Sequence, residues 1–157
     1  MSTVSAIVYT SNTGFTRRYA EMLAQKTGLP ACDLKGPAPA RGTAVVYLGW
    51  LRAGNVKGLG KARRRYDVKA VGVVGMAAEP NGKVLEDQTI PAFYLRGGLA
   101  LDKLKGLYKR MMASMGGMVR KAPAKTDAER EMQEAFVNGG DWVDEAYLEP
   151  MVEFLKG

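Results

Sequence analysis

The stretch that decides the fold is VSAIVYTSNTGFTRRYAEMLAQKT, residues 4–27. An apolar run at 4–9 leads into a glycine- and hydroxyl-rich turn at 10–16, and the helical pattern RRYAEMLAQKT follows. A turn that joins a strand to a helix in this way presents free backbone N–H groups and the positive end of the helix dipole. Ser11, Thr13 and Thr16 add hydroxyl donors. The sequence therefore predicts a phosphate-binding loop after the first strand.

The spacing within this loop excludes two common phosphate loops. It lacks the GxxxxGK followed by Ser or Thr of nucleoside triphosphatases, and it lacks the GxGxxG of dinucleotide-binding folds. A plainer alternative is that a turn rich in Ser, Thr and Asn only caps the helix, because these residues are common N-caps. The residues of the loop leave both interpretations open.

Strand and helix patterns alternate along the first hundred residues. The alternation predicts a parallel, doubly wound α/β sheet with right-handed crossovers, and near-continuous apolar runs are typical of strands covered on both faces. The segment 35–42, with two prolines, is expected to be a loop or a degraded helix. The expected strands are 4–9, 29–34, 44–49, 70–75 and 91–95, and the expected helices are 16–26, about 56–66 and a weaker one around 84–88.

The C-terminal third predicts further helices. Apolar residues spaced three and four apart indicate an amphipathic helix at about 102–119, followed by an acidic helix near 127–137 and an Asn-Gly-Gly turn at 138–140. A closing helix is expected with Asp141 as its N-cap. Its apolar positions, expected to pack on the sheet, are Val143, Tyr147, Met151 and Leu155. We expect one domain over 1–157, with 102–140 as a variable helical segment.

Composition restricts the chemistry that is open to the chain. With one cysteine and no histidine, the sequence excludes an internal disulfide, a Cys/His zinc site and a histidine-based catalytic triad. Cys32 is expected to be a small core residue. We predict no catalytic side chain and no metal ligand, so any chemistry must come from a bound cofactor. The sequence shows neither an 18-residue apolar run nor a signal-peptide pattern, which makes a cytoplasmic protein the expectation.

Charge is unevenly distributed along the chain. The formal net charge is +7, yet residues 126–157 carry nine acidic and only two basic side chains. A basic body with an acidic end could contact nucleic acid, anionic lipid or an acidic redox partner. The Arg63, Arg64, Arg65 run falls at a predicted helix end, where cations offset the dipole. Because no helix-turn-helix, zinc-finger or RNP-type pattern accompanies it, we predict no nucleic-acid partner.

The loop spacing resembles one known family. Ser11, Thr13, Gly14 and Thr16 follow the SxTGxT pattern of flavodoxins, and with the element order and length the resemblance covers about residues 4–115. It implies an α/β three-layer flavodoxin-like sandwich, with a five-stranded parallel sheet of order 2-1-3-4-5 and helices on both faces. It also implies FMN as the cofactor, bound at the switch point between strands 1 and 3, a rule for which flavodoxins are themselves a standard example.

The same resemblance implies a site built from three loops. Its FMN-binding residues would be Thr10, Ser11, Asn12, Thr13, Gly14, Phe15 and Thr16 on the phosphate; Trp50, Leu51, Arg52, Ala53 and Gly54 beside the flavin ring; and Gly75, Met76, Ala77 and Ala78 as a second wall. Trp50 or Leu51 would lie near the ring, although a tryptophan here could simply cover the sheet. Arg52 would stabilise the anionic reduced flavin, or be an ordinary solvated arginine.

A narrower similarity concerns FYLRGGLALDKLKGLYKRMM (93–112) and LRAG (51–54), which look similar to the flavodoxin-like protoporphyrinogen oxidase subgroup. The leading expectation is an FMN electron-transfer protein with a redox partner protein or a quinone. The alternatives are a quinone-coupled FMN oxidoreductase and a flavodoxin-fold interaction module without turnover.

Flavodoxins that carry electrons are strongly acidic, and this chain is basic. The difference favours an acidic partner or a peripheral contact with the anionic inner face of a membrane. Met112, Met115 and Met118 could contact such a hydrophobic partner, quinone or lipid surface, or belong to an ordinary core stripe.

Overall fold

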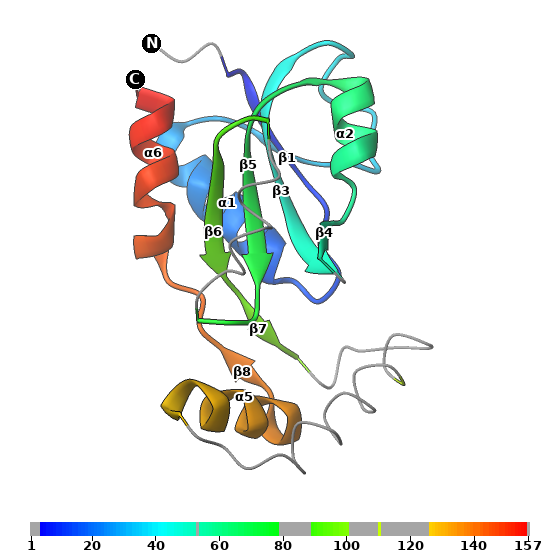
Figure 1. Cartoon of the computed structure of the whole chain (residues 1–157). Helices are drawn as coiled ribbons and strands as arrows, with labels where there is room; N and C mark the ends of the chain where they lie inside the picture. Colours follow the sequence, from blue (N-terminus) through cyan, green and yellow to red (C-terminus); the bar gives the residue numbers. More distant parts are fainter. Residues whose placement is uncertain (1–3, 53, 79–88, 101–109, 111–125, 157) are drawn as a thin grey trace.

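The computed structural model of the chain describes residues 4–52, 54–78, 89–100, 110 and 126–156 (Figure 1). The expected helix at 84–88, the expected helix at 102–119 apart from residue 110, and Ala53 lie outside the described residues. The same holds for Met112, Met115 and Met118.

A mostly parallel sheet forms the centre of the molecule. Five parallel strands lie in the order β2-β1-β3-β5-β6, and the short strand β4 pairs antiparallel with β3. The sheet therefore has six strands rather than five, because β3 continues past the expected end at residue 49 and turns back as β4. The strands are β1 (Ala6–Tyr9), β2 (Ala31–Asp33), β3 (Ala44–Arg52), β4 (Asn55–Val56), β5 (Asp67–Gly75) and β6 (Ala92–Arg96).

Helices flank both faces of this sheet, which confirms the expected α/β class. On one face α1 (Phe15–Thr27) and α6 (Glu149–Lys156) cover a core that includes Tyr19 and Met151. On the other face α2 (Leu59–Arg65) contributes Ala62 to a second core. Side chains alternate between the two cores along each strand, so a central strand must be apolar on both faces. The apolar runs in the sequence are nearly continuous because the central strands are covered on both faces.

A small second sheet lies beyond the carboxyl ends of the strands. There β7 (Gly98–Leu99) pairs antiparallel with β8 (Gly140–Asp141), and α5 (Asp127–Asn138) precedes β8. Figure 1 shows α5 beside β8 and away from the main sheet. The acidic helix expected near 127–137 is confirmed by α5. Its N-cap is Thr126, whose hydroxyl accepts a hydrogen bond from the Glu129 N–H at 3.1 Å.

The expected N-cap of the closing helix is wrong. Asp141 belongs to β8, and the short 3-10 helix η2 (Glu145–Leu148) that leads into α6 is capped by Asp144, which accepts from the Ala146 N–H at 2.9 Å. The four apolar positions expected to pack on the sheet do contact its core.

Two smaller expectations can also be compared with the structure. Cys32 is half-buried on the edge strand β2 rather than in the core, because β2 has a neighbour on one side only. The segment 35–42 contains turns and no helix, in agreement with its two prolines.

Candidate functional site

The predicted phosphate loop lies at the carboxyl end of β1 and leads directly into α1. Gly14 forms the N-cap in the left-handed region, at φ 101°, which favours glycine. The Ser11 hydroxyl oxygen accepts from the backbone N–H of Gly14 at 3.2 Å and of Arg17 at 3.3 Å. The first helical hydrogen bond runs from the Arg18 N–H to the Gly14 carbonyl. The amides of Phe15 and Thr16 precede that bond and point out of the helix end, as an anion site requires.

The start of α1 is cationic. Acidic side chains usually stabilise a first helical turn, but α1 has none there and carries Arg17 and Arg18 instead. Arg17 pairs with Glu21 at 2.9 Å, and Arg18 pairs with Asp141 of β8 at 2.8 Å. Two cations therefore follow the Phe15 and Thr16 amides in the first turns of α1, which adds attraction for an anion.

Asp141 keeps its charge in this arrangement. Burial alone would raise the pKa of its carboxyl, but hydrogen bonds from Arg18 and from the Val143 N–H outweigh burial and lower that pKa. The ion pair with Arg18 therefore joins the start of α1 to β8 at neutral pH.

The second predicted segment is a strand and a hairpin rather than a loop. Trp50 packs against the core on the α1 face, whereas Leu51 packs against the core on the α2 face. Arg52 is exposed, and strand alternation places it on the same face as Trp50. Gly54 makes the turn at φ 84°, and β4 then pairs back onto β3.

The third predicted segment is held in place by side chains of β6. The Tyr94 hydroxyl donates to the Ala77 carbonyl at 2.7 Å, and the Arg96 guanidinium donates to the Met76 carbonyl at 3.2 Å. Burial raises the pKa of Tyr94 to about 12, so the phenol keeps the proton that it donates. Gly75 leaves room for the Tyr94 ring, because a Cβ at that position would meet the phenol.

The fold brings the three segments to one edge of the sheet. Leu48 of β3 pairs with Tyr9 of β1, and Trp50 pairs with Val74 of β5, so these parallel strands end side by side. The Thr10 N–H also donates to the Leu48 carbonyl at 3.0 Å, which ties the loop to β3.

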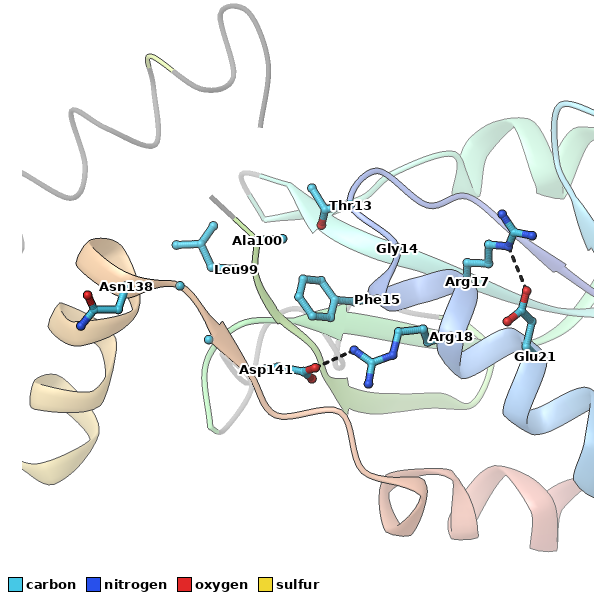
Figure 2. Close-up of a pocket in the computed structure, with 12 residues that line it drawn as sticks. Thr13, Gly14, Phe15, Arg17, Arg18, Glu21, Leu99, Ala100, Asn138 and Asp141 are labelled. Atoms are coloured by element: carbon cyan, nitrogen blue, oxygen red, sulfur yellow. Dashed lines mark hydrogen bonds and ion pairs between the residues drawn. The ribbon is translucent and has the colours of Figure 1, made fainter. Parts of the chain in front are cut away.

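The structure has a pocket of about 780 Å³, and it lies to one side of this edge (Figure 2). Of the predicted site residues that the structure describes, only Thr13, Gly14 and Phe15 line it. In Figure 2 the Phe15 side chain points toward Leu99, with the Arg18–Asp141 pair nearby. The other lining residues are Arg17, Arg18, Glu21, Leu99, Ala100, Asn138, Gly139, Gly140 and Asp141. The pocket thus joins the phosphate loop to the β7–β8 pair, and none of the described residues of the second and third segments lines it.

Two loop hydroxyls lie in different surroundings. The Tyr47 phenol is close to both the Lys57 carbonyl, at 2.5 Å, and the Thr10 hydroxyl, at 2.7 Å. Because a carbonyl can only accept, the phenol donates to Lys57 and the Thr10 hydroxyl donates to the phenol. Thr10 is therefore occupied in joining β1 to β3. Thr16, on the first turn of α1, is only 2% exposed.

Sequence reasoning assigned no role to Arg96, which organises one end of the site. This arginine is 9% exposed, its guanidinium lies 4.0 Å from the centre of the Trp142 ring, and it pairs with Glu131 of α5 at 2.5 Å. Together with its bond to Met76, these contacts join β6, the third segment and α5. The sequence did contain one sign of a role for Arg96, because it is a charged residue at the end of an apolar strand and is followed by two glycines.

Within the described residues, no group of three or more His, Cys, Asp or Glu side chains could hold a metal ion. No helix in those same ranges is long and apolar enough to cross a membrane. Comparison with protein-family models, with curated protein sequences and with solved structures finds no match to this chain.

Proposed function

We propose that this chain is a flavodoxin-like protein that binds FMN and transfers electrons. The observation that carries the proposal is the position of the start of α1, which has a glycine N-cap and no side-chain cap, at the carboxyl end of β1 and next to β3. With β4 left aside, the order β2-β1-β3-β5-β6 corresponds to the flavodoxin order 2-1-3-4-5. In such sheets, ligands bind where the strand order reverses, which here is between β1 and β3.

The residues at this edge are chemically suited to FMN. The Phe15 and Thr16 amides and the Thr13 and Thr16 hydroxyls would hold the phosphate. Trp50 offers an aromatic surface for the flavin ring on the α1 face of β3. When bound, FMN supplies the electron-transfer chemistry, and the protein supplies binding, orientation and charge near the ring.

FMN fits this site better than FAD. The loop offers donors for one terminal phosphate, and the chain has one α/β unit rather than the two mononucleotide-binding halves of a dinucleotide fold. Flavin released from the purified, loaded protein should therefore be FMN. Recovery of FAD alone at one equivalent would overturn this choice.

The direct test is titration of FMN with the protein, followed by flavin absorbance and fluorescence. Thr13→Ala and Thr16→Ala should each weaken binding by about 1 to 3 kcal/mol, the scale of a hydrogen bond to a charged group. Thr43→Ala is the matched control. Thr43 precedes β3 at the opposite edge of the sheet, and its hydroxyl donates to the Ala40 carbonyl at 2.6 Å.

Circular dichroism of each variant separates lost binding from lost folding. If Thr13→Ala and Thr16→Ala bind FMN like the unaltered chain, the loop is only a helix cap. If the folded protein takes up no FMN at all, the chain is an interaction module and the proposal fails. Catalytic turnover of the FMN-loaded protein with a quinone would instead make it an oxidoreductase.

A further inference from the structure

In one continuous part of the sequence, almost all of the charged residues are basic. Residues 35–69 contain nine Lys and Arg and a single acidic residue, Asp67. That acid is already paired with Lys69 at 2.8 Å. Seven of the other cations, namely Lys35, Arg41, Lys57, Lys61, Arg63, Arg64 and Arg65, form what we call the α2 basic face, whereas Arg52 lies on the other face of β3.

Hydrogen bonds hold these residues next to one another. The Arg65 guanidinium donates to the Leu34 carbonyl at 3.0 Å, and the Gly42 N–H donates to the Arg65 carbonyl at 2.9 Å. These bonds place Lys35 and Arg41 beside α2. At the other end of α2, the Lys57 N–H donates to the Trp50 carbonyl at 2.9 Å, next to Arg52.

The dipole of α2 explains only some of these cations. Cations at a helix C-terminus are stabilised by the dipole, which accounts for Arg63, Arg64 and Arg65. Lys57 and Lys61 lie at the N-terminal end, where the same dipole opposes them. Both side chains are exposed. The helix dipole therefore does not account for Lys57 and Lys61. A negatively charged binding partner would account for them.

Two of the arginines are already fixed. Arg63 donates to the Thr89 hydroxyl at 2.6 Å, and the Arg65 guanidinium lies over the Tyr66 ring at 5.0 Å. Side chains held in this way lose less conformational entropy when they bind a partner. Arg64, between these two arginines, and Lys61, which precedes them, are exposed and available for contact.

Exposed acidic side chains lie on the opposite face of the sheet. Asp144, Glu145, Glu149 and Glu153 are exposed on η2 and α6. Figure 1 shows α2 and α6 on opposite sides of the sheet. The α1 face also carries Arg17, Arg18, Lys26 and Lys156, so its acids and bases nearly balance. The α2 basic face is cationic throughout, and it therefore attracts an approaching acidic partner before contact.

We infer that the α2 basic face docks an acidic protein. If the proposed function holds, on which this part rests, that protein is the electron carrier that exchanges electrons with the bound flavin. A partner docked on this face would lie close to the phosphate loop. The start of α2 is next to that loop, since a Cβ at Gly58, the N-cap of α2, would lie 2.8 Å from the Thr10 hydroxyl. An acidic protein is favoured over a lipid surface because the apolar side chains of α2 are turned inward: Ala62 is buried and Leu59 is half-buried. Interfacial helices present an exposed apolar face.

The test measures binding of a small acidic plant-type ferredoxin, labelled with a fluorophore, by anisotropy at salt concentrations from about 20 to 300 mM, above which exposed charges are largely screened. The double variant Lys61→Gln/Arg64→Gln removes two exposed cations of the α2 basic face. Its matched control, Arg130→Gln/Lys156→Gln, removes two exposed cations from α5 and α6. Both variants change the net charge equally.

We expect the unaltered protein to bind the ferredoxin in a salt-sensitive manner. At low salt the α2 variant should bind about three- to tenfold more weakly and the control less than twofold, and the differences should vanish at high salt. No binding, or an equal loss in both variants, would overturn the docking surface.

Two further measurements identify other occupants. Salt-sensitive binding to anionic phospholipid vesicles that the α2 variant loses, without ferredoxin binding, would assign the face to a membrane and overturn the inference. Self-association at low salt that the α2 variant abolishes would assign it to a second copy of the chain and overturn it as well. FMN titration of the same proteins reports on the proposed function separately, since the anisotropy needs no flavin.

Discussion

At the residue scale, Arg52 has a testable relation to the proposed flavin. It shares a strand face with Trp50, so its charge faces the side on which the ring would lie. Arg52→Met should lower the reduction potential of bound FMN, because one cation at about 8 Å stabilises the anionic reduced form by about 1 kcal/mol at an effective dielectric of about 40. Arg64→Met, an equal charge change on α2, is the control. Spectroelectrochemical titration measures both, and an unchanged potential in Arg52→Met would place that charge away from the ring.

Asp141 and Asp144 show what a local residue pattern cannot decide. Each precedes the closing helix and suits an N-cap, but Asp141 is drawn into β8 by a residue 43 positions earlier in the chain, its pairing partner Gly98. We expect Asp144→Ala to lower the free energy of unfolding by about 0.5 to 2 kcal/mol through the lost cap. Asp141→Ala should cost no more than about 1 kcal/mol, the range of an exposed ion pair. Urea denaturation compares them, and the reverse ranking would contradict the assignment.

At the element scale, Arg96 connects α5 to the main sheet. Arg96→Met would leave Glu131 and the Met76 carbonyl without this donor and remove the cation from the Trp142 ring. We expect destabilisation of α5 and the β7–β8 pair by about 1 to 3 kcal/mol, with little change in the strand core. Hydrogen exchange measures this locally as faster exchange in 126–142. Arg130→Met, an exposed change on α5, is the control, and equal effects of the two would show that Arg96 anchors nothing.

Elements of different length were predictable to different degrees. The five parallel strands and α1 follow from apolar runs and helical spacing that extend over several residues. β4, β7 and β8 have two residues each, too few for any periodicity. The β7–β8 pair depends on glycines instead, since a Cβ on Gly98 would meet the Gly140 carbonyl oxygen. Such a close approach joins segments far apart in sequence, and no local pattern encodes it.

At the scale of the whole molecule, the convergence of the three predicted segments followed from topology. Parallel strands place their carboxyl ends at one edge, and the family resemblance implied that residues 10–16, 50–54 and 75–78 come together there. The pocket was not predicted, because it needs Phe15 of α1 and Leu99 of β7 to meet across a long-range pairing. Two of its lining residues, Arg18 and Asp141, form an ion pair between positions that are distant in the sequence.

Two buried tyrosines on opposite faces of the sheet make the whole fold sensitive to alkali. Burial raises the pKa of Tyr19, on the α1 face, and of Tyr47, on the α2 face, to about 12 from an ordinary value of 10. The folded state thus holds each phenol proton more tightly than the unfolded chain does. The stability that this difference provides is fully present below about pH 10 and is lost as the pH rises through about 12, by about 2 kcal/mol for each tyrosine.

Tyr47→Phe tests this linkage. At neutral pH the variant should be less stable than the unaltered protein, since the Lys57 carbonyl and the Thr10 hydroxyl lose their phenol partner. Between pH 10 and 12 the difference in unfolding free energy between the two proteins should shrink. The unaltered protein is destabilised by ionisation of its buried phenol, whereas the phenylalanine has no proton to lose. Urea denaturation at stepped pH, with tyrosinate absorbance followed in parallel, measures both effects. A constant difference in unfolding free energy across this range would show that Tyr47 ionises equally easily in the folded and unfolded chain.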